Sequence, residues 1–181
     1  NSFYDPKLKE KNVQKFLKNV NFKLYKVDIR DKNVLTKIFY EEKPEKIMHL
    51  AAMAGVRPSL KNPELYFDVN VNGSLNLLNL AVKFEIKNFV YASSSSIYGN
   101  NKKIPFAESD KVDNPISPYA ASKKSLELLA SVYSHLYGLN CTGLRFFTVY
   151  GPNSRPDMAH RKFANLIINK KKIKVYGDGT T

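Results

Sequence analysis

Apolar residues along the chain fall into two patterns, short runs that suit strands and stretches with apolar positions three and four residues apart that suit helices. The runs predict strands at 22–27, 46–52, 88–93, 141–147 and 173–176. The helical spacing predicts helices at 31–42, 63–84, 118–137 and 158–169. Asp31 is expected to cap the first of these helices, and Pro118 to mark the start of the third. A polar loop that contains proline is expected at 99–118.

Strands that alternate with helices indicate an α/β fold, a doubly wound parallel sheet built by right-handed crossovers and covered by helices on both faces. Ligands of such sheets bind beyond the carboxyl ends of the strands. Residues suited to chemistry follow the predicted strands at these ends, namely Asp28, 51–55, the serines 93–96, Phe147, Thr148 and Tyr150. The sequence therefore predicts that these residues gather at one edge of the sheet.

With 181 residues, of which 43% are hydrophobic and 25% charged, the chain has the size of one ordinary domain and a composition that excludes disorder. No apolar run reaches the roughly 18 residues of a membrane-spanning helix. No signal-peptide pattern opens the chain, and the lack of an initiator methionine leaves its native start open. The one cysteine, Cys141, excludes an internal disulfide and a cysteine-based zinc site, and it suits the reducing cytoplasm.

The chain carries 29 basic and 16 acidic residues, a net charge of +13. Such a balance suits either a polyanion-binding protein or a well-solvated surface. The lysines are dispersed, and the densest run, 170–174, is expected at a helix end, where cations complement the helix dipole. We therefore expect a solvated surface, with neither a membrane nor a nucleic acid as partner, and a field that also attracts an anionic nucleotide.

Tyr119 and Lys123 stand four residues apart in a predicted helix, so their side chains share one face. A phenol ordinarily ionises near pH 10, and a neighbouring ammonium favours the ionised form. A bound nicotinamide cation adds to this effect, and lowering a pKa by about 3 corresponds to about 4 kcal/mol. The pair is a candidate general base, and a serine at a neighbouring strand end can bond the same substrate oxygen.

Tyr119-x-x-x-Lys123, preceded by the run 89–99 with its four serines, resembles the extended short-chain dehydrogenase/reductases, the NAD-dependent epimerase/dehydratase family of nucleotide-sugar enzymes. The similarity covers essentially the whole chain. It implies a Rossmann-like domain in which Tyr119 is the catalytic base, Lys123 supports it, and Ser94 bonds the substrate hydroxyl, with Ser96 as the other candidate. It also implies NAD as the cofactor and a UDP-sugar as the substrate.

The resemblance assigns binding roles motif by motif. Contacts to the cofactor are implied for Asp28, Ile29, Leu50, Ala51, Ala52, Ala54, Asn70, Ser93, Tyr119, Lys123 and Phe147. Contacts to the substrate are implied for Ser94, Ser95, Thr148, Arg155 and Arg57. No metal is expected, because His135 and His160 have no acidic or cysteine partners at the spacing of metal ligands.

Within this family, the segments 51–57, 93–96 and 148–159 are most similar to UDP-glucuronate 4-epimerases, which implies interconversion of UDP-glucuronate and UDP-galacturonate through a 4-keto intermediate. A uronate carries a carboxylate that a planar guanidinium can pair with, so Arg155 is the candidate residue for binding that carboxylate. Related dehydratases and decarboxylases place an acidic residue after the catalytic serine or threonine. Ser95 and Ser96 stand there instead, so epimerisation is expected.

The family begins with a strand and a Gly-x-x-Gly-x-x-Gly turn for the pyrophosphate, and this motif does not occur among the 8 glycines of the chain. The segment 1–6 resembles a stretch after the family's second strand, and 175–181 resembles the start of the uridine-diphosphate site. The chain is therefore expected to be truncated at both ends and to have little activity alone. Residues 1–152 are expected to form a partial NAD-binding domain, and 153–181 the start of the substrate-binding portion.

Two other functions remain open from the sequence. One is a 4-epimerase for UDP-glucose or UDP-N-acetylglucosamine, which a role for Arg155 in uronate turnover would exclude. The other is a non-catalytic Rossmann-type binding protein, with nucleic acid as a partner in view of the charge of +13, and the intact set of Ser94, Tyr119 and Lys123 argues against it. The resemblance also implies a homodimer through the helices near 63–84 and 119–137.

Overall fold

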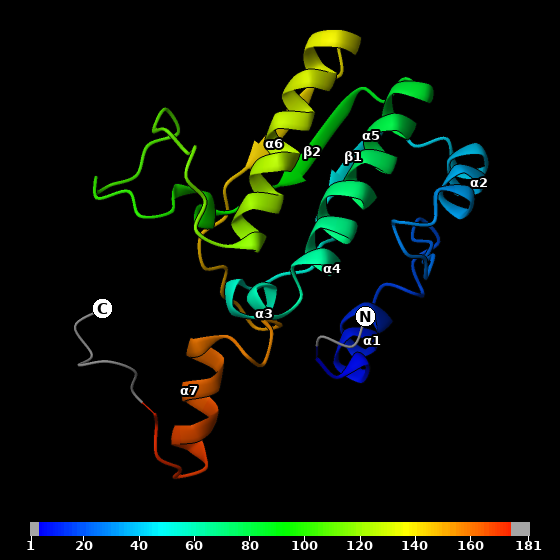
Figure 1. Ribbon diagram of the computed structural model, residues 1–181. Helices are drawn as coiled ribbons and strands as arrows, with labels where there is room; N and C mark the ends of the chain where they lie inside the picture. Colours follow the sequence, from blue (N-terminus) through cyan, green and yellow to red (C-terminus); the bar gives the residue numbers. More distant parts are fainter. Residues whose placement is uncertain (1–3, 175–181) are drawn as a thin grey trace. The chain divides into compact units, whose positions relative to one another are not determined.

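The computed structural model, which describes residues 4–174, contains a parallel sheet of three strands (Figure 1). The strands are β1 (Lys46–His49), β2 (Asn88–Ala92) and β3 (Cys141–Leu144), in the order β1-β2-β3. Phe89 of β2 is in register with Ile47 on one side and with Cys141 on the other. The predicted α/β class with a parallel, Rossmann-like sheet is confirmed.

The chain divides into two compact units, Lys26–Phe147 and the combination of Asn1–Tyr25 with Thr148–Thr181. The first unit holds the sheet. The second holds α1 (Pro6–Gln14) and α7 (Ala159–Ile168), of which the sequence predicted only α7. The boundary expected after residue 152, between an NAD-binding part and a substrate-binding part, stays a prediction.

The larger unit contains the remaining helices. They are α2 (Lys32–Glu42), α3 (Val56–Lys61), α4 (Pro63–Phe67), the π-helical turn η1 (Asp68–Asn72), α5 (Gly73–Lys83), the 3-10 turn η2 (Ser95–Tyr98) and α6 (Pro118–Tyr137). As predicted, the side chain of Asp31 caps α2, accepting a hydrogen bond of 3.0 Å from the backbone of Val34. Ser117 caps α6 in the same way through Ala120, and Pro118 fills the first helical position. The single helix predicted at 63–84 is present as α4, η1 and α5 in direct succession.

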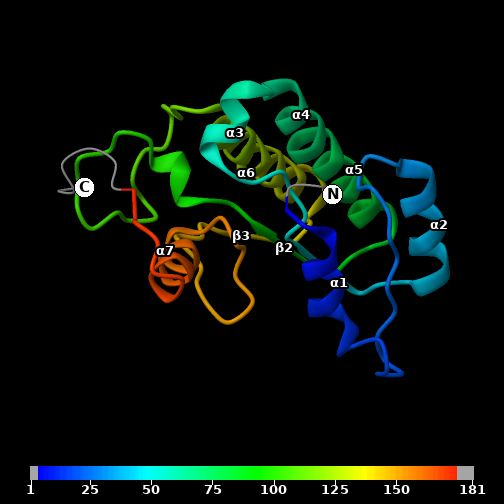
Figure 2. The same cartoon turned by 90° about the horizontal axis from the view of Figure 1, so that it is seen from below.

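The helices α5 and α6, which carry the chain from β1 to β2 and from β2 to β3, lie side by side on one face of the sheet (Figures 1 and 2). Two right-handed crossovers that step in the same direction place both helices on the same face. The core lies between them and the sheet, with α2 packed beside α5. Its most deeply buried members are Leu78, Leu80, Ala81, Phe89, Leu126 and Ala130.

The predicted strand at 22–27 is wrong, because this segment has no regular structure. A strand needs ladder hydrogen bonds from a neighbour, and the sheet of the described residues places β1 at its edge without a strand beyond it. The strands predicted at 46–52 and 141–147 end at His49 and Leu144, where the chain leaves the sheet. Of the strand predicted at 173–176, the first two residues are irregular and the rest lie outside the described residues, as does the segment 175–181.

Candidate active site

The carboxyl ends of the three strands bring the predicted site segments of the larger unit to one edge. β1 leads into 50–55, β2 into the serines, and β3 into 145–147. Two backbone hydrogen bonds extend the pairing of the strands beyond β2, from Ser93 to Leu144 (2.8 Å) and from Ser95 to Phe146 (2.9 Å). Residues 93–98, which we call the serine turn, and the segment after β3 are therefore held side by side. The sequence predicted that these segments meet at one edge of the sheet.

Lys123 and Tyr119 lie one turn apart on α6. The ammonium of Lys123 is buried and donates a 2.8 Å hydrogen bond to the carbonyl of Ala92, the last residue of β2. The ring of Tyr119 meets that of Tyr66 edge to face at 6.2 Å, and the hydroxyl of Tyr66 donates to the carbonyl of Ala54. The ring of Tyr119 is therefore linked through Tyr66 to the segment after β1, and the ammonium of Lys123 is bonded to the end of β2. Both side chains thus lie at the edge where the site was predicted.

Burial governs the protonation of the cations and bases near α6. It lowers the pKa of Lys123 to about 8, which leaves the ammonium mostly protonated at neutral pH. His49 is buried as well, and burial together with the charge of Lys123 lowers the pKa of its imidazole to about 4. Its Nε2 lies 2.8 Å from the hydroxyl of Ser74. His49 is therefore a neutral, hydrogen-bonded interior residue.

The serines after β2 differ in what their hydroxyls contact. Ser93 donates a 2.6 Å hydrogen bond from its hydroxyl to the carboxylate of Glu127, and its backbone N–H donates to Leu144, so only its oxygens are left to accept a hydrogen bond from the cofactor. Ser94 is buried and caps η2, with its oxygen accepting from the backbone of Ser96 at 3.2 Å. Its hydroxyl proton can still donate to a ligand. Of the two candidates for the substrate hydroxyl, Ser94 stays the one we favour.

Asn70 sits in the π-helical turn η1 and is almost fully buried. Its side-chain oxygen accepts from the backbone of Met53 at 2.7 Å, and its amide donates to the carbonyl of Met53 and to the hydroxyl of Ser122, each at 3.0 Å. The hydroxyl of Ser122 in turn donates to the carbonyl of Tyr119. Asn70 thus joins the segment after β1 to the start of α6. Both N–H groups of its side-chain amide are used in these contacts, so neither is available to a ligand.

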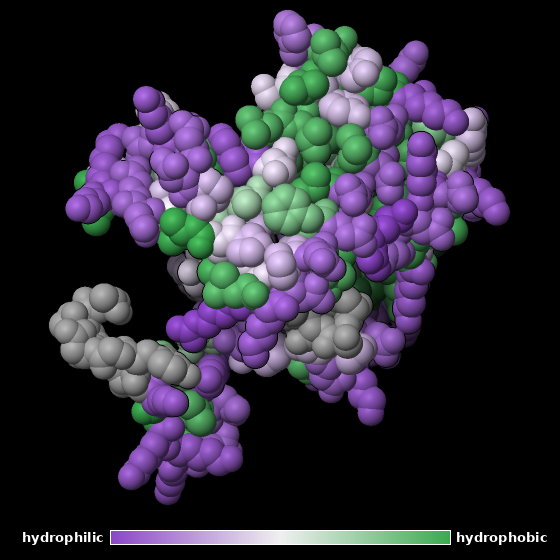
Figure 3. Space-filling view, viewed as in Figure 1, coloured by the Kyte–Doolittle hydropathy of each residue, from purple (hydrophilic) through white to green (hydrophobic). Residues whose placement is uncertain are grey.

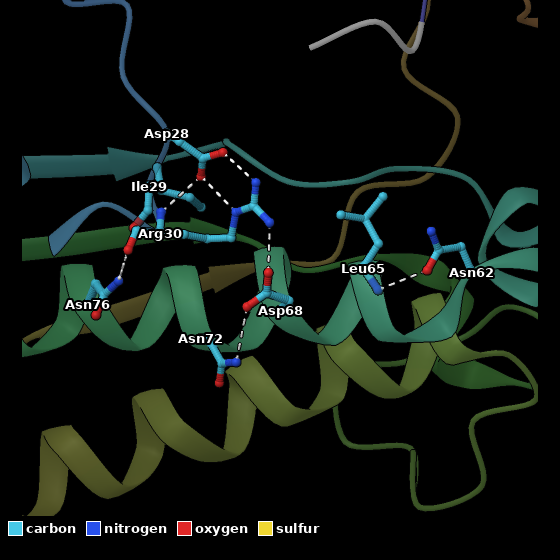
Figure 4. A network of polar contacts seen from close by, with 8 residues as sticks. All are labelled: Asp28, Ile29, Arg30, Asn62, Leu65, Asp68, Asn72 and Asn76. Atoms are coloured by element: carbon cyan, nitrogen blue, oxygen red, sulfur yellow. Dashed lines mark hydrogen bonds and ion pairs between the residues drawn. The ribbon is translucent and has the colours of Figure 1, made fainter.

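Asp28 lies in a polar network that anchors the segment 28–30, where cofactor contacts were predicted (Figure 4). Its carboxylate accepts from the backbone and guanidinium of Arg30, and these hydrogen bonds lower the pKa of Asp28 to about 2. Arg30 also donates to Asp68 at 2.7 Å. The carbonyl of Ile29 accepts from Asn76 of α5. The carboxylate of Asp28 is therefore ionised, half-exposed and fixed in place, as a hydroxyl-binding group needs to be.

The remaining predicted site residues lie on exposed segments of the larger unit or in the second unit. Leu50 and Phe147 are exposed beyond β1 and β3, and the ring of Phe147 stacks on Phe106 at 6.1 Å. Arg57 is exposed on the short helix α3. Thr148 and Arg155 belong to the second unit, where Arg155 pairs with Asp157 at 3.3 Å. Their roles as ligand contacts stay predictions.

Sequence reasoning missed three side chains that organise this site, Tyr66, Glu127 and Arg145. Glu127 repeats the four-residue spacing of Tyr119 and Lys123 on α6, which was a usable signal. Tyr66 and Arg145 reach their partners across the fold, and no local pattern marks them. Within residues 4–174 no cluster of three or more His, Cys, Asp or Glu could hold a metal ion. The same part of the chain has no helix with the length and apolarity needed to cross a membrane.

Comparison with known proteins gives one consistent result. The model of the family described as "NAD dependent epimerase/dehydratase family" matches residues 5–181. The chain is 50% identical to Protein CapI of Staphylococcus aureus over 99% of this chain and 53% of that protein. It is 49% identical to the UDP-glucuronate 4-epimerase of Thermodesulfobacterium geofontis over 99% of this chain and 55% of that enzyme. The chain thus spans about half the length of the curated relatives it matches.

Solved structures show the same relationship. The crystal structure of UDP-glucuronic acid 4-epimerase from Bacillus cereus, in complex with UDP-glucuronic acid and NAD, matches with a TM-score of 0.88 and 33% identity over 97% of this chain and 55% of that chain. The UDP-N-acetylglucosamine 4-epimerase from Methanobrevibacter ruminantium matches with a TM-score of 0.81 and 34% identity over 90% of this chain and 52% of that chain.

Proposed function

The chain belongs to the NAD-dependent epimerase/dehydratase family, and from this premise we propose that the complete protein is a 4-epimerase that interconverts UDP-glucuronate and UDP-galacturonate. The observation that carries the proposal is the arrangement on α6. Lys123 is bonded to the last residue of β2, directly before the serine turn, and Tyr119 lies one turn earlier. The proposed base (Tyr119), its supporting cation (Lys123) and the hydroxyl donor (Ser94) thus lie at one edge of the sheet.

The residues of this edge fit the nucleoside and nicotinamide parts of NAD. Ala51, Ala52 and Ala54 have small side chains that let a ligand approach the backbone, and Gly55 has a φ of 98°, which favours glycine. The fixed carboxylate of Asp28 can accept hydrogen bonds from hydroxyl or amino groups. A glycine-rich turn for the pyrophosphate is not part of this sequence. We propose that Asp28, the segment 51–54, Tyr119 and Lys123 hold the cofactor.

Tyr119, Ser94 and Lys123 have different roles in moving the proton of the sugar's 4-hydroxyl. The cofactor, when bound, supplies reversible acceptance of a hydride from C4 of the sugar. Tyr119 takes the proton of the 4-hydroxyl as the C4–H bond breaks, and returns it when that bond forms again on the other face. Ser94 donates a hydrogen bond to the same oxygen, and Lys123 places a positive charge one helical turn from the phenol.

Epimerisation is favoured over dehydration by the acid–base chemistry of the site. Elimination needs a general acid for the departing hydroxyl, and the serine run supplies none. Glu127 is the carboxylate nearest to this run in the contacts described. Burial raises its pKa, but hydrogen bonds from Arg145 and Ser93 outweigh burial and leave the pKa below its usual value. Glu127 is therefore ionised and committed to other partners.

The substrate is tested by assaying the complete protein with NAD. We expect UDP-glucuronate to yield UDP-galacturonate, followed by NMR of the sugar's anomeric and H4 signals. Conversion of only UDP-glucose or UDP-N-acetylglucosamine would contradict the uronate assignment and favour the alternative 4-epimerase, which the similarity to the Methanobrevibacter enzyme also supports.

Arg155→Ala in the complete protein is expected to raise the KM for UDP-glucuronate roughly 30-fold, because a bidentate charge-assisted contact is worth about 2 kcal/mol. Steady-state kinetics with UDP-glucuronate and UDP-glucose measure the effect. Arg155→Lys is the matched control that keeps the charge but loses the planar fork, and we expect an intermediate KM. An unchanged KM in Arg155→Ala would remove Arg155 from the role of carboxylate reader.

We also propose a homodimer, supported by an apolar stripe on α6. Leu128, Val132 and Leu136 recur every four residues on α6, and each is about half exposed, at 57%, 48% and 62%. Apolar side chains gather over α6 and α5 on the face shown in Figure 3. A stripe of this kind in a water-soluble helix indicates a protein partner.

Leu128→Glu combined with Leu136→Glu is expected to convert the dimer to a monomer, because it places four charges in the apolar interface of the pair. Sedimentation velocity of the complete protein measures the change. The matched control is Ser134→Glu, an exposed position elsewhere on α6. A double variant with an unchanged sedimentation coefficient would place the interface elsewhere. We further propose a cytoplasmic location, supported by the single cysteine, which is unpaired.

A further inference from the structure

Glu127 lies on α6 one turn after Lys123, and its carboxylate is held on both oxygens. Ser93 donates to Oε1 at 2.6 Å, and Arg145 donates from Nε to Oε1 at 3.0 Å and from Nη2 to Oε2 at 3.1 Å. The side chains of Glu127 and Arg145 are only 13% and 20% exposed. A shielded, bidentate pair of this kind fixes geometry more strictly than a surface ion pair.

Arg145 extends the connection from Glu127 to the far end of the serine turn. Its Nη1 donates to the hydroxyl of Tyr98 at 3.2 Å and to the carbonyl of Glu108 at 3.0 Å. The guanidinium also lies over the ring of Tyr98, 5.2 Å from its centre. Ser93 directly precedes Ser94, the cap of η2, and Tyr98 is the last residue of η2, so the carboxylate of Glu127 reaches one end of this segment directly and the other through Arg145.

The end of β2 is therefore joined to α6 at two consecutive residues. The carbonyl of Ala92 accepts from Lys123, and the hydroxyl of Ser93 donates to Glu127, one helical turn further on. These two bonds set both the distance and the rotation of the serine turn relative to α6. The relative position of Ser94 and Tyr119 depends on that distance and rotation, because each lies within one turn of these anchors.

We propose that Glu127 is a positioning residue for the epimerase reaction, which holds the hydroxyl of Ser94 and the phenol of Tyr119 in the relative placement that lets both bond one sugar oxygen. This inference rests on the proposed function. Glu127 acts through Ser93 and Arg145, and it does not contact the substrate. A displacement of about 1 Å in such a constellation can cost about a hundredfold in rate.

Glu127→Gln tests the proposal in the complete protein. The amide keeps the volume and can accept from Ser93, but its N–H groups face the N–H groups of Arg145 and break the bidentate pairing. We expect kcat to fall 10- to 100-fold while the KM for the UDP-sugar stays within about threefold. Glu45→Gln is the matched control, because Glu45 forms an exposed ion pair with Lys87 before β1 and β2. It is expected to leave both constants unchanged.

A second variant separates positioning from stability. Replacing the pair with apolar residues, Glu127→Met with Arg145→Leu, often preserves the stability of a buried ion pair's site. Its Tm is compared with that of the unsubstituted protein. A normal Tm with a reduced kcat supports the proposal, and a normal Tm with a normal kcat overturns it. If Glu127→Gln does not fold, this variant decides.

The hydroxyl of Ser93 gives an independent measure. Ser93→Ala is expected to lower kcat, and the combination with Glu127→Gln to lower it no further than Glu127→Gln alone, because both act through one connection. Additive losses would overturn the proposal. If the unsubstituted protein turns over no UDP-sugar, the proposed function fails and the positioning role fails with it. If it turns over a UDP-sugar and Glu127→Gln leaves kcat unchanged, only the positioning role fails.

Discussion

Tyr119→Phe in the complete protein is expected to lower kcat for UDP-glucuronate by about a thousandfold or more, because it removes the group that we propose as the acceptor of the 4-hydroxyl proton. General acid–base catalysis by a positioned side chain contributes about 100- to 10,000-fold. The ring itself should stay in place, since its edge-to-face contact with Tyr66 does not involve the hydroxyl of Tyr119. We therefore expect the fold around the ring to be kept and the loss to fall mainly on kcat.

Two controls accompany the Tyr119→Phe experiment. Tyr137→Phe makes the same chemical change at an exposed position at the end of α6 and is expected to leave kcat unchanged. Fluorescence titration with NAD checks that the variant still binds the cofactor. A loss in kcat smaller than tenfold, with normal binding, would show that another group takes the proton.

Lys123→Met is expected to remove at least 99% of the activity and at the same time to stabilise the fold at neutral pH. The activity is expected to fall because the variant loses the positive charge one helical turn from the proposed base, Tyr119. The stability rises because burial lowers the pKa of Lys123 from 10.5 to about 8. This shift means that the buried ammonium lowers the free energy of unfolding by about 3 kcal/mol at neutral pH. The unpaired carbonyl of Ala92 costs about 1–2 kcal/mol in return, so a net gain of about 1–2 kcal/mol is expected.

The pH dependence of stability identifies the cause. Between pH 8 and 10.5 the unfolded chain still holds the proton of Lys123 while the folded protein has released it, so the stability of the unsubstituted protein rises with pH in this window. Lys123→Met lacks this contribution, so its advantage should disappear by about pH 10. Urea unfolding at pH 7 and pH 10 measures both values. The exposed Lys37→Met is the control, and a variant that is less stable by the same amount at both pH values would contradict the argument.

Local signals mark the starts of two of the predicted helices. Asp31 caps α2 through Val34, three residues along the chain, and Pro118 fills the first position of α6. The convergence of the alanines and the serines at one edge followed from strand order, because parallel strands end on the same side. In the larger unit only α3 lacked a usable signal, since it is six residues long and starts at Gly55 without a side-chain cap.

The failures share a dependence on distant partners. The segment 22–27 alternates as a strand should, but β geometry requires a neighbouring strand, and no periodicity reveals whether one is present. The π-helical turn at 68–72 has the same apolar spacing as an α-helix, so the position of Asn70 against Met53 could not be anticipated. The contact of Glu127 with Arg145 joins residues 18 positions apart, and only the folded sheet brings them together.

The most direct test of the central claim follows the hydrogen at C4 of the sugar. The complete protein is incubated with NAD and UDP-glucuronate that carries deuterium at C4, and the product is analysed by NMR and mass spectrometry. The account predicts UDP-galacturonate that retains deuterium at C4, because the label leaves and returns as a hydride while Tyr119 moves only the hydroxyl proton. Product in which C4 has exchanged with water, or the absence of any change at C4, would contradict it.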